Sequence, residues 1–410
     1  MMEDKFGPFP ISSEVRRAVE EYLNVPTVFK GQYWTKTGIK FSDSIKNFRE
    51  MFTDVLLDFR IVSNSCKGTS WEGDAQYMEA TISQFIDWQH GVATPETPFY
   101  KFNKEKFWAY SSYNYMNIIF SKEFKMLQDM NWGQFGFPEI TGKDSTFWLG
   151  STGANTPCHV DSYGCNLIAQ VFGRKKWVLF PPEDAKFLYP TRIPYEESSI
   201  FSSVNVAEPD LEKHPLFKKA HPYVVILEND EVLFVPKGWW HFVLNLDSVT
   251  VSVNTWIKLE SDSSSHLAES ATKVLMTALI SSYEPEGEIW LNPKEELVSP
   301  DETLGYIIST LKELKNKGDI SNCHAQDSKT KVPKLKKEDN VHSERCNDNI
   351  FSFQNIISVK STSILKLYSK ENEISSEKPQ CDHEITTEKI INCFVHPDVI
   401  KLVCQLLKEI

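Results

Sequence analysis

The middle of the chain, from about residue 146 to 259, alternates short apolar runs with clusters of turn-forming residues. Runs of roughly 4–8 residues rich in Val, Ile, Phe and Trp are typical of strands. Turns are predicted where Pro181-Pro182, Lys237-Gly238 and Asp247-Ser248 interrupt the runs. The strands are expected at 146–149, 165–172, 176–180, 223–227, 231–235, 241–246 and 250–256. Several short strands at this spacing predict a mainly β fold, a sandwich or barrel of the double-stranded jelly-roll kind.

Helical periodicity flanks this β region on both sides. Before it, a helix is expected from Ser12, as a cap, to about Leu23, and a second short helix after Thr81. Strands expected at 26–31 and 55–62 make the first hundred residues a mixed α and β segment. After the β region, apolar residues at helical spacing predict helices at 268–282 and 304–314.

The composition changes after about residue 318. Asn, Ser, Lys, Glu and Asp dominate to about residue 385, which predicts a flexible linker with a more apolar island at 350–368. Beyond it, Pro397 suits the first position of a helix whose apolar stripe comprises Val399, Leu402, Val403, Leu406 and Ile410. The expected organisation is an N-terminal segment at 1–100 packing on a jelly-roll domain at 101–260, a helical extension at 261–317, the linker at 318–385 and an amphipathic helix at 386–410.

Composition and charge narrow the class of function. Hydrophobic residues make up 41% of the 410 residues, so most of the chain can build a large core. No apolar run approaches the roughly 20 residues of a membrane span, and the first residues lack a basic and apolar leader, so neither a membrane segment nor a signal peptide is expected. A net charge of −12 argues against nucleic acid as a partner but leaves basic peptides and proteins open.

Eight cysteines without a CxxC pair predict reduced thiols rather than a zinc module. We therefore expect the cytoplasm, with the nucleus as the alternative location.

Two short segments carry candidate chemistry. His159 and Asp161 are two residues apart, so on a strand both side chains point to the same face. His241 follows 80 residues after Asp161 on a later expected strand. Two His and one Asp can bind one face of Fe(II) and leave open positions for other ligands, as in non-haem iron oxygenases. From the spacing alone, iron, another metal and no metal remain open, because a lone His is more often a satisfied core residue.

Residues 150–257 resemble the JmjC domain, a cupin-type domain of Fe(II)- and 2-oxoglutarate-dependent oxygenases. The segments that carry the resemblance are Thr156-Pro-Cys-His-Val-Asp161, Asn166-Leu-Ile-Ala-Gln170, Gly173-Arg-Lys-Lys-Trp-Val-Leu-Phe-Pro-Pro182, Val235-Pro-Lys-Gly-Trp-Trp-His241 and Ser252-Val-Asn-Thr-Trp256. They are similar to the subgroup that contains the asparaginyl hydroxylase of hypoxia-inducible factor. Segments at 107–110, 187–199 and 391–399 resemble JmjC proteins associated with small heat-shock proteins, so the resemblance covers nearly the whole chain outside the linker.

The resemblance implies a role for each matching residue. His159, Asp161 and His241 would bind Fe(II). Lys175 and Thr156 match positions that hold the distal carboxylate of 2-oxoglutarate, where a charge-assisted bond suits a semi-buried pocket. The remaining positions near the cosubstrate are Asn166, Asn254 and Tyr110. One extra residue between Asp161 and Asn166 leaves the choice between Lys175 and Lys176 open at this point.

The resemblance also implies an activity, that of an oxygenase using Fe(II), 2-oxoglutarate and O2, with hydroxylation of a protein or peptide side chain expected. Lysine demethylation is the weaker alternative, because no chromatin-reading zinc module is recognisable. A second alternative is a weakly active or inactive JmjC scaffold that binds a small heat-shock protein, the partner that the resemblance implies in a stress response. The substrate groove is expected to involve the loop at 190–203.

Overall fold

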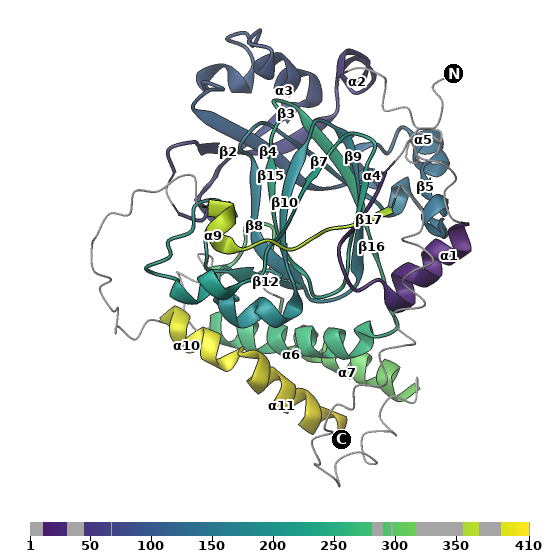
Figure 1. Cartoon of the computed structure of the whole chain (residues 1–410), viewed down its shortest axis with the longest axis vertical. Helices are drawn as coiled ribbons and strands as arrows, with labels where there is room; N and C mark the ends of the chain where they lie inside the picture. Colours follow the sequence, from purple (N-terminus) through teal and green to yellow (C-terminus); the bar gives the residue numbers. More distant parts are fainter. Residues whose placement is uncertain are drawn as a thin grey trace.

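The computed structural model of the chain describes residues 11–30, 45–66, 68–280, 290–296, 298–316, 356–368 and 387–409. Two antiparallel sheets lie face to face and form a double-stranded jelly roll, with helices over one sheet and a group of helices below (Figure 1). The predicted fold class, a jelly-roll core with C-terminal helices, is confirmed. Most of the expected linker at 318–385 lies outside the described residues.

The larger sheet combines the N-terminal strands with one half of the jelly roll. Its order is β17 (Ile356–Ser358), β1 (Thr27–Phe29), β14 (Val232–Val235), β9 (Cys165–Phe172), β16 (Thr250–Ile257), β7 (Thr146–Gly150), β4 (Phe107–Tyr115), β2 (Leu56–Ser63) and β3 (Gln76–Thr81). The N-terminal strands therefore extend the jelly-roll sheet through hydrogen bonds, with β1 paired to β14 and β4 paired to β7.

The smaller sheet carries most of the chemistry-bearing residues. Its order is β11 (Pro190–Thr191), β12 (Ser199–Ser202), β8 (Asn155–Asp161), β15 (Trp240–Asn245), β10 (Lys175–Phe180) and β13 (Tyr223–Leu227). A separate hairpin comprises β5 (Asn131–Trp132) and β6 (Phe137–Thr141). The expected strands between 146 and 259 match described strands to within a few residues, whereas β8, β11 and β12 in that region, and β4 before it, were not among the expected strands.

Alternation along the strands separates the interior of the jelly roll from its outer faces. On β8, Cys158 and Val160 pack into an apolar cluster on the outer side, so His159 and Asp161 point the other way. On β9, Leu167 packs with the N-terminal helices, while Ile168 packs between the sheets. The interior is therefore apolar at one end and polar at the other.

The largest apolar core lies between the larger sheet and the N-terminal helices. These helices are α1 (Ser12–Arg17) and its π-helical continuation Ala18–Tyr22, α2 (Ile45–Met51), α3 (Ile82–Gln89), α4 (Met116–Ile119) and α5 (Phe124–Asp129). Aromatic side chains fill this space, and Phe48 of α2, for example, stacks on Phe147 of β7. Thr81 caps α3 with a capping box, as predicted, but Ile11 and not Ser12 occupies the N-cap of α1.

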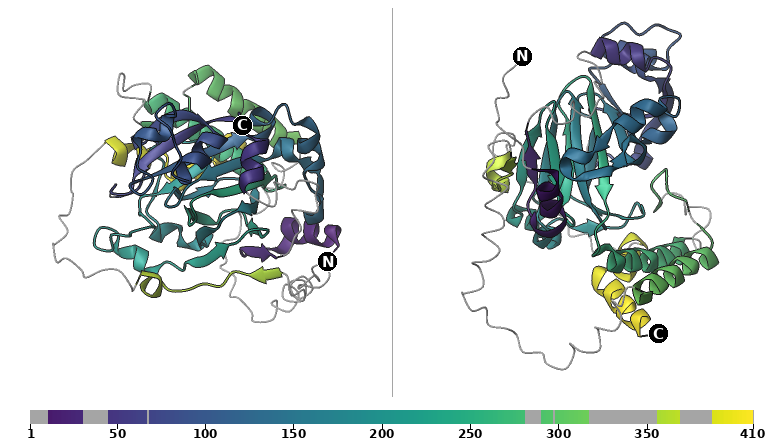
Figure 2. Two further views of the ribbon diagram at one scale, coloured as in Figure 1. Left: turned by 90° about the horizontal axis from the view of Figure 1, so that it is seen from above. Right: turned by 90° about the vertical axis from the view of Figure 1, so that its right-hand side faces the viewer.

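The C-terminal helices form a separate group below the jelly roll (Figure 2). They are α6 (Asp262–Ile280), α7 (Pro300–Asn316), α10 (Thr387–Phe394) and α11 (Pro397–Lys408). Leu267 and Ala271 of α6 pack against Ile307 and Leu314 of α7. The short 3-10 helices elsewhere are Glu72–Asp74, Pro98–Lys101, Gly133–Phe135, Gly142–Asp144, Pro182–Phe187 and Pro215–Lys219.

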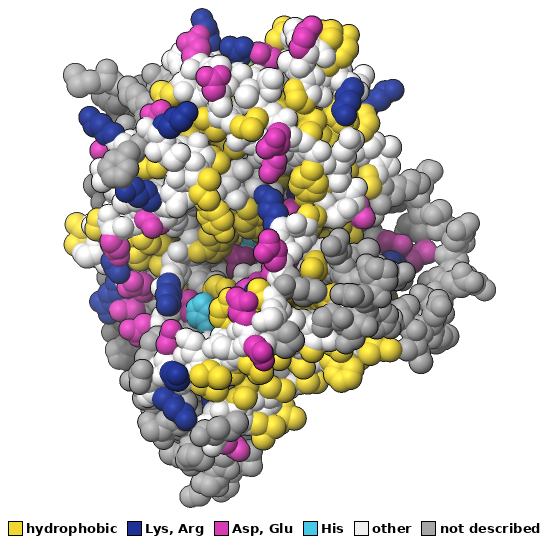
Figure 3. Space-filling model, turned by 180° about the vertical axis from the view of Figure 1, so that it is seen from behind, with side chains coloured by type: hydrophobic (Ala, Val, Ile, Leu, Met, Phe, Trp, Pro, Cys, Tyr) yellow, Lys and Arg dark blue, Asp and Glu magenta, His cyan; other side chains and the backbone are white. Residues whose placement is uncertain are grey.

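Most of the apolar stripe expected on the last helix faces away from the fold, and Ile410 lies outside the described residues. Leu402 and Leu406 of α11 are each 56% exposed, whereas Ile400 is buried and Val403 lies against α6 and α7. The direction of α6 decides which face is covered, and the periodicity of α11 alone carries no information on that direction. Hydrophobic side chains accordingly gather along the lower part of the surface in Figure 3.

Within the described residues, Thr387–Lys408 is long and apolar enough to cross a membrane by length and composition, with 22 residues and a mean hydropathy of 1.5. The segment is divided between α10 and α11, and Ile391 of α10 packs with Met276 of α6.

Residues 356–368, inside the expected linker, lie along the outside of the jelly roll (Figure 1). β17 pairs with β1 at the edge of the larger sheet, and α9 (Ile364–Tyr368) packs beside the 3-10 helix Pro215–Lys219. The hydroxyl of Tyr368 donates to the carbonyl oxygen of Val206 at 2.6 Å. The apolar island predicted from the sequence therefore packs on this chain itself.

Candidate active site

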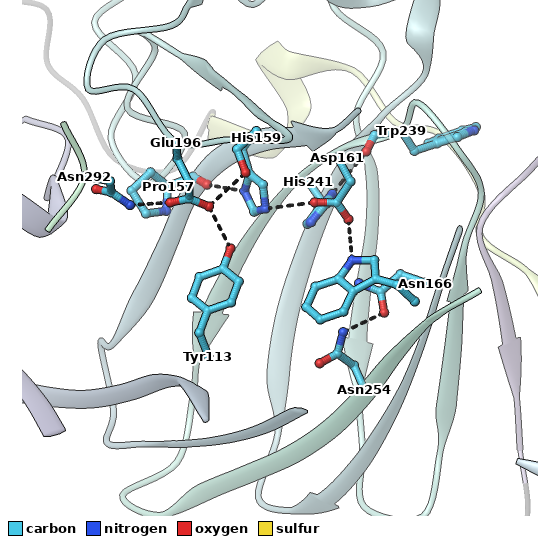
Figure 4. A network of polar contacts seen from close by, with 12 residues as sticks. Tyr113, Pro157, His159, Asp161, Asn166, Glu196, Trp239, His241, Asn254 and Asn292 are labelled. Atoms are coloured by element: carbon cyan, nitrogen blue, oxygen red, sulfur yellow. Dashed lines mark hydrogen bonds and ion pairs between the residues drawn. The ribbon is translucent and has the colours of Figure 1, made fainter. Parts of the chain in front are cut away.

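The smaller sheet brings the three predicted metal ligands together. His159 on β8 and His241 on β15 are directly opposite each other in the ladder, and Asp161 is two residues further along β8. One ligand atom from each of the three residues lies within 4.8 Å of the other two. Nε2 of His159 is 3.7 Å from Oδ1 of Asp161. The fold therefore brings Asp161 and His241, which are 80 residues apart in the sequence, into one cluster with His159 (Figure 4).

Backbone carbonyls orient both imidazoles. Nδ1 of His159 lies 2.9 Å from the carbonyl oxygen of Pro157, and Nδ1 of His241 lies 3.1 Å from that of Trp239. A carbonyl only accepts hydrogen bonds, so each Nδ1 carries a proton and each Nε2 is directed toward the site. Burial, and then the nearby His159, lower the pKa of His241 to about 4, which keeps this ring neutral near pH 7. Imidazole nitrogens and a carboxylate are suitable ligands for a divalent transition metal.

Asp161 is held by a residue that the sequence analysis did not assign to the site. Nε1 of Trp256 donates to Oδ2 of Asp161 at 3.0 Å, which leaves Oδ1 on the side of His159. Outer partners of this kind orient a ligating carboxylate. Trp256 follows Asn254 by two residues on β16, so alternation along this strand, counted from the Asn254 that the resemblance implied, could have indicated it.

Lys175 ends in a small cavity of about 40 Å³ that the three ligands also line. Its side chain is inside the jelly roll, with 2% of the residue exposed, so Lys175 and not the half-buried Lys176 lines the cavity. Nζ donates to Oγ of Ser252 at 2.6 Å and to the hydroxyl of Tyr110 at 3.4 Å. Burial lowers the pKa of Lys175 to about 7, and within the described residues no carboxylate pairs with it.

The other predicted cosubstrate residues line the same cavity. Thr156 lies against Tyr110, whose pKa burial raises to about 12, so the phenol stays protonated and can donate. Nδ2 of Asn254 donates to Oδ1 of Asn166 at 2.9 Å, and Nε1 of Trp148 donates to Oδ1 of Asn254 at 2.7 Å. The two amides thus fix each other, and all eight residues singled out from the sequence meet at one end of the jelly-roll interior.

A second pocket, of about 370 Å³, adjoins this cavity. Tyr113, Asp161 and Trp256 line both. A bulge in β4, where Tyr113 has a φ of 56°, turns this ring against Trp148, with 4.6 Å between ring centroids. A positive φ is unusual for a bulky residue. The second pocket is therefore an approach to the triad, walled by an aromatic residue in a constrained backbone.

Glu196 lines the second pocket from the loop between β11 and β12. Its carboxylate accepts hydrogen bonds from Tyr113, Ser199 and Asn292 (Figure 4). Burial, and then the carboxylate of Glu72, raise the pKa of Glu196. The loop was expected to build the substrate groove, but no motif marked Glu196, because its surroundings come from four separate segments.

The donor set fits both groups that the family resemblance implies. Two imidazole nitrogens and a carboxylate oxygen converge on one point, as a divalent iron requires. A buried ammonium with only hydroxyl partners suits the carboxylate of a dicarboxylic cosubstrate. Fold and site together define a JmjC-type protein with a cupin-like domain.

Comparison with known proteins agrees with this class. The cupin-like domain family matches residues 73–263. HSPB1-associated protein 1 homolog of Danio rerio is 36% identical over 442 residues, covering 97% of this chain and 97% of that protein. HSPB1-associated protein 1 of Homo sapiens is 50% identical over 226 residues, which is 55% of this chain and 46% of that protein. The chain belongs to the HSPB1-associated protein 1 family.

The length of the match differs among relatives. The aligned part spans about half of the human relative and 59% of the relative from Bos taurus. A more distant match is tRNA wybutosine-synthesizing protein 5 of Homo sapiens, 37% identical over 33% of this chain and 41% of that protein.

Proposed function

We propose that the protein is an Fe(II)- and 2-oxoglutarate-dependent oxygenase. The observation that carries the proposal is the joint arrangement of His159, Asp161 and His241 with Lys175 in one cavity. A metal-binding triad alone would suit several classes of protein. A triad that shares its cavity with a buried ammonium lacking a counter-charge is typical of a site for a metal and a carboxylate together.

His159, Asp161 and His241 would hold the iron through Nε2, a carboxylate oxygen and Nε2. The bound metal would supply the oxidation chemistry of this class, in which 2-oxoglutarate and O2 yield succinate and CO2 as a substrate C–H bond is hydroxylated. The protein contributes ligand geometry and the exclusion of water. Trp256 fixes the carboxylate of Asp161, and the two backbone carbonyls fix the imidazoles.

Lys175 would bind the distal carboxylate of 2-oxoglutarate, assisted by the hydroxyls of Ser252, Tyr110 and Thr156. These side chains provide one charge and several neutral donors in a buried place, where charge-assisted bonds are strong. Asn166 and Asn254 would border the other side of the cosubstrate without adding charge.

A protein side chain is the substrate that we favour over nucleic acid, because the chain carries a net charge of −12. Hydroxylation is favoured over lysine demethylation by the resemblance of the core motifs to the asparaginyl hydroxylase subgroup. We place the reaction in the cytoplasm, with the nucleus as the alternative, and the five described free thiols suit a reducing compartment.

An anaerobic titration of the purified protein with Fe(II) and 2-oxoglutarate tests the proposal. Bidentate binding of the cosubstrate gives a weak visible charge-transfer band. We expect this band in the native protein and its loss in Asp161→Ala, with Asp247→Ala, a surface carboxylate paired with Arg174, as the control. Well-folded, iron-loaded protein without the band would overturn the oxygenase proposal.

We also propose that the chain binds a small heat-shock protein, as the name of its relatives says of them. This proposal stands with or without catalysis, and it would survive as the scaffold alternative if the site were inactive. The exposed apolar face of α10 and α11 is available for such a contact. Capture of purified HSPB1 by the full chain and by Asp161→Ala separates the two functions, since equal capture is expected. Failure of the full chain to capture it would reject the partner.

A further inference from the structure

The second pocket, beside the triad, is lined by the acidic side chain of Glu196, which has no ion-pair partner among the described residues. Four other carboxylates around the loop between β11 and β12 each have a cationic partner. These pairs are Glu72 with Arg60, Glu197 with Lys273, Glu269 with Arg192, and Glu295 with Lys273. Within the described part of the chain, Glu196 has no ion pair, and its hydrogen-bond partners are the neutral side chains of Tyr113, Ser199 and Asn292.

Lys294 and His159 interact electrostatically with Glu196, but among the described residues neither forms an ion pair with it. Nζ of Lys294 donates to the carbonyl oxygen of Ser112 at 2.9 Å. A carboxylate offers about four acceptor positions, and three hydrogen bonds leave capacity for a further donor. Withdrawing such a group from water is unfavourable unless a cation compensates. The carboxylate of Glu196 therefore lies in the wall of the pocket and can form an ion pair with an incoming cation.

The position of Glu196 relates it to the reacting centre. Glu196 and the metal ligand Asp161 line the same pocket, and Ser199, three residues after Glu196, is paired with Asp161 in the ladder. The hydroxyl of Tyr113 lies 3.3 Å from Oε1 of Glu196, and the ring of Tyr113 is parallel to that of Trp256. A side chain entering this pocket meets the carboxylate and an aromatic face beside the triad, an environment that suits a cation.

The surface beyond Asn292 has the same sign of charge. A groove of about 1480 Å³ begins there, and its acidic lining residues are Asp74, Glu208, Asp210, Glu295, Glu296 and Glu388. Lys213 is the lysine among the described lining residues, so the groove carries an excess of negative charge. Figure 3 shows one face of the molecule with a hollow near its centre, inside which acidic and histidine side chains are visible.

We propose that Glu196 selects a lysine or arginine side chain of the protein substrate, with the flanking basic segment lying in the acidic groove. The proposal rests on the proposed oxygenase function and names the substrate class of that same site. A neutral or acidic side chain would leave the carboxylate of Glu196 uncompensated, so discrimination comes from the charge of the incoming group.

Fluorescence anisotropy with labelled synthetic peptides tests the proposal. The peptides share a Gly/Ser host sequence of equal length and differ in one central residue, which is lysine, arginine, glutamine or glutamate. The protein is loaded anaerobically with Fe(II) and 2-oxoglutarate. We expect the lysine or arginine peptide to bind at least about tenfold more tightly than the glutamine peptide, and the glutamate peptide to bind most weakly.

Glu196→Gln should reduce that preference by about tenfold and leave the charge-transfer band unchanged. Glu197→Gln is the matched control, because this neighbouring carboxylate already pairs with Lys273 and should not affect the preference. The comparison among peptides on the native protein needs no variant, so it holds even if Glu196→Gln fails to fold.

Equal affinity for all peptides, including no binding up to about 1 mM, would overturn the proposal while an intact band kept the oxygenase function. A charge preference that persists undiminished in Glu196→Gln would also overturn it. A preference without any band would support the recognition by Glu196 and reject the oxygenase function.

Discussion

Two buried cations of the jelly roll have opposite surroundings. Arg192 donates from Nη1 and Nη2 to the two carboxylate oxygens of Glu269, at 3.0 and 2.5 Å, and both residues are less than 10% exposed. Lys175 is buried even more completely, yet its partners are the hydroxyls of Ser252 and Tyr110. We conclude that the buried charge of Arg192, which has a partner, stabilises the fold. The buried charge of Lys175, which has none, indicates a ligand-binding site.

The pair of Arg192 and Glu269 joins the loop between β11 and β12 to α6. Glu269 on α6 also accepts from the backbone N–H of Ser198 and from the hydroxyl of Ser162. Lys175 instead keeps an uncompensated charge inside the protein, which lowers its pKa to about 7. That cost is removed when an anion binds, so affinity for a ligand and stability of the ligand-free protein oppose each other at this position.

The largest effect is expected when the paired charge loses its partner. Arg192→Met leaves Glu269 buried and uncompensated, so the free energy of unfolding should fall by about 3–5 kcal/mol. Chemical denaturation measures this change. Arg174→Met is the matched control, because Arg174 makes an equally bidentate pair with Asp247 but is 50% exposed, and such surface pairs contribute only about 0–1 kcal/mol. Equal losses in the two variants would contradict the distinction between buried and exposed pairs.

Removal of the unpaired charge should affect binding and leave folding intact. Lys175→Met is expected to weaken 2-oxoglutarate binding by roughly 10- to 100-fold, because a charge-assisted hydrogen bond is lost. The same variant should raise the melting temperature of the ligand-free protein, since a buried ammonium is removed. Titration of the charge-transfer band and thermal unfolding measure the two effects. Lys176→Met, on the opposite face of β10, should change neither, and a destabilised Lys175→Met would show that this lysine is structural.

The unpaired charge of Lys175 should also make stability and cosubstrate affinity depend on pH, with a smaller effect than the substitutions above. The pKa of Lys175 is lowered to about 7 from 10.5, so between these values the folded, ligand-free protein binds fewer protons than the unfolded chain. The contribution of this group to the free energy of unfolding therefore rises with pH across that window. The cosubstrate binds the protonated lysine, so its affinity should fall above about pH 7, by up to about tenfold per pH unit. The fall should be absent in Lys175→Met, and an identical slope in that variant would assign it to another group.

The smallest effect is expected on the exposed face of α11. Leu402→Ser should change the free energy of unfolding by less than about 0.5 kcal/mol, because Leu402 is 56% exposed. Ile400→Ala, on the buried face of the same helix, should cost roughly 2–4 kcal/mol. Similar losses for both would mean that the two faces are equally covered in solution.

The cluster of His159, Asp161 and His241 was predictable from the sequence because these residues lie on regular strands. The two-residue spacing of His159 and Asp161 is enough to place both side chains on one face of β8. The pattern of apolar runs placed His241 on a later strand, and the family resemblance singled out Lys175. The sequence did not indicate Glu196, Tyr113 and Ser252 as site residues, because the role of each depends on contacts between distant segments. An example is the hydrogen bond from Tyr113 to Glu196.

The sequence predicted most strands between 146 and 259, the shared face of His159 and Asp161, and the residue types of the triad. Local periodicity and motif spacing encode these features, since each depends on neighbours within a few residues. Only the tertiary structure decided which face of α11 is covered, how residues 356–368 lie on the jelly roll, and which charges lack a partner. Those features depend on the distance between side chains far apart in the chain, and that distance exists only once the sheets and helices have packed.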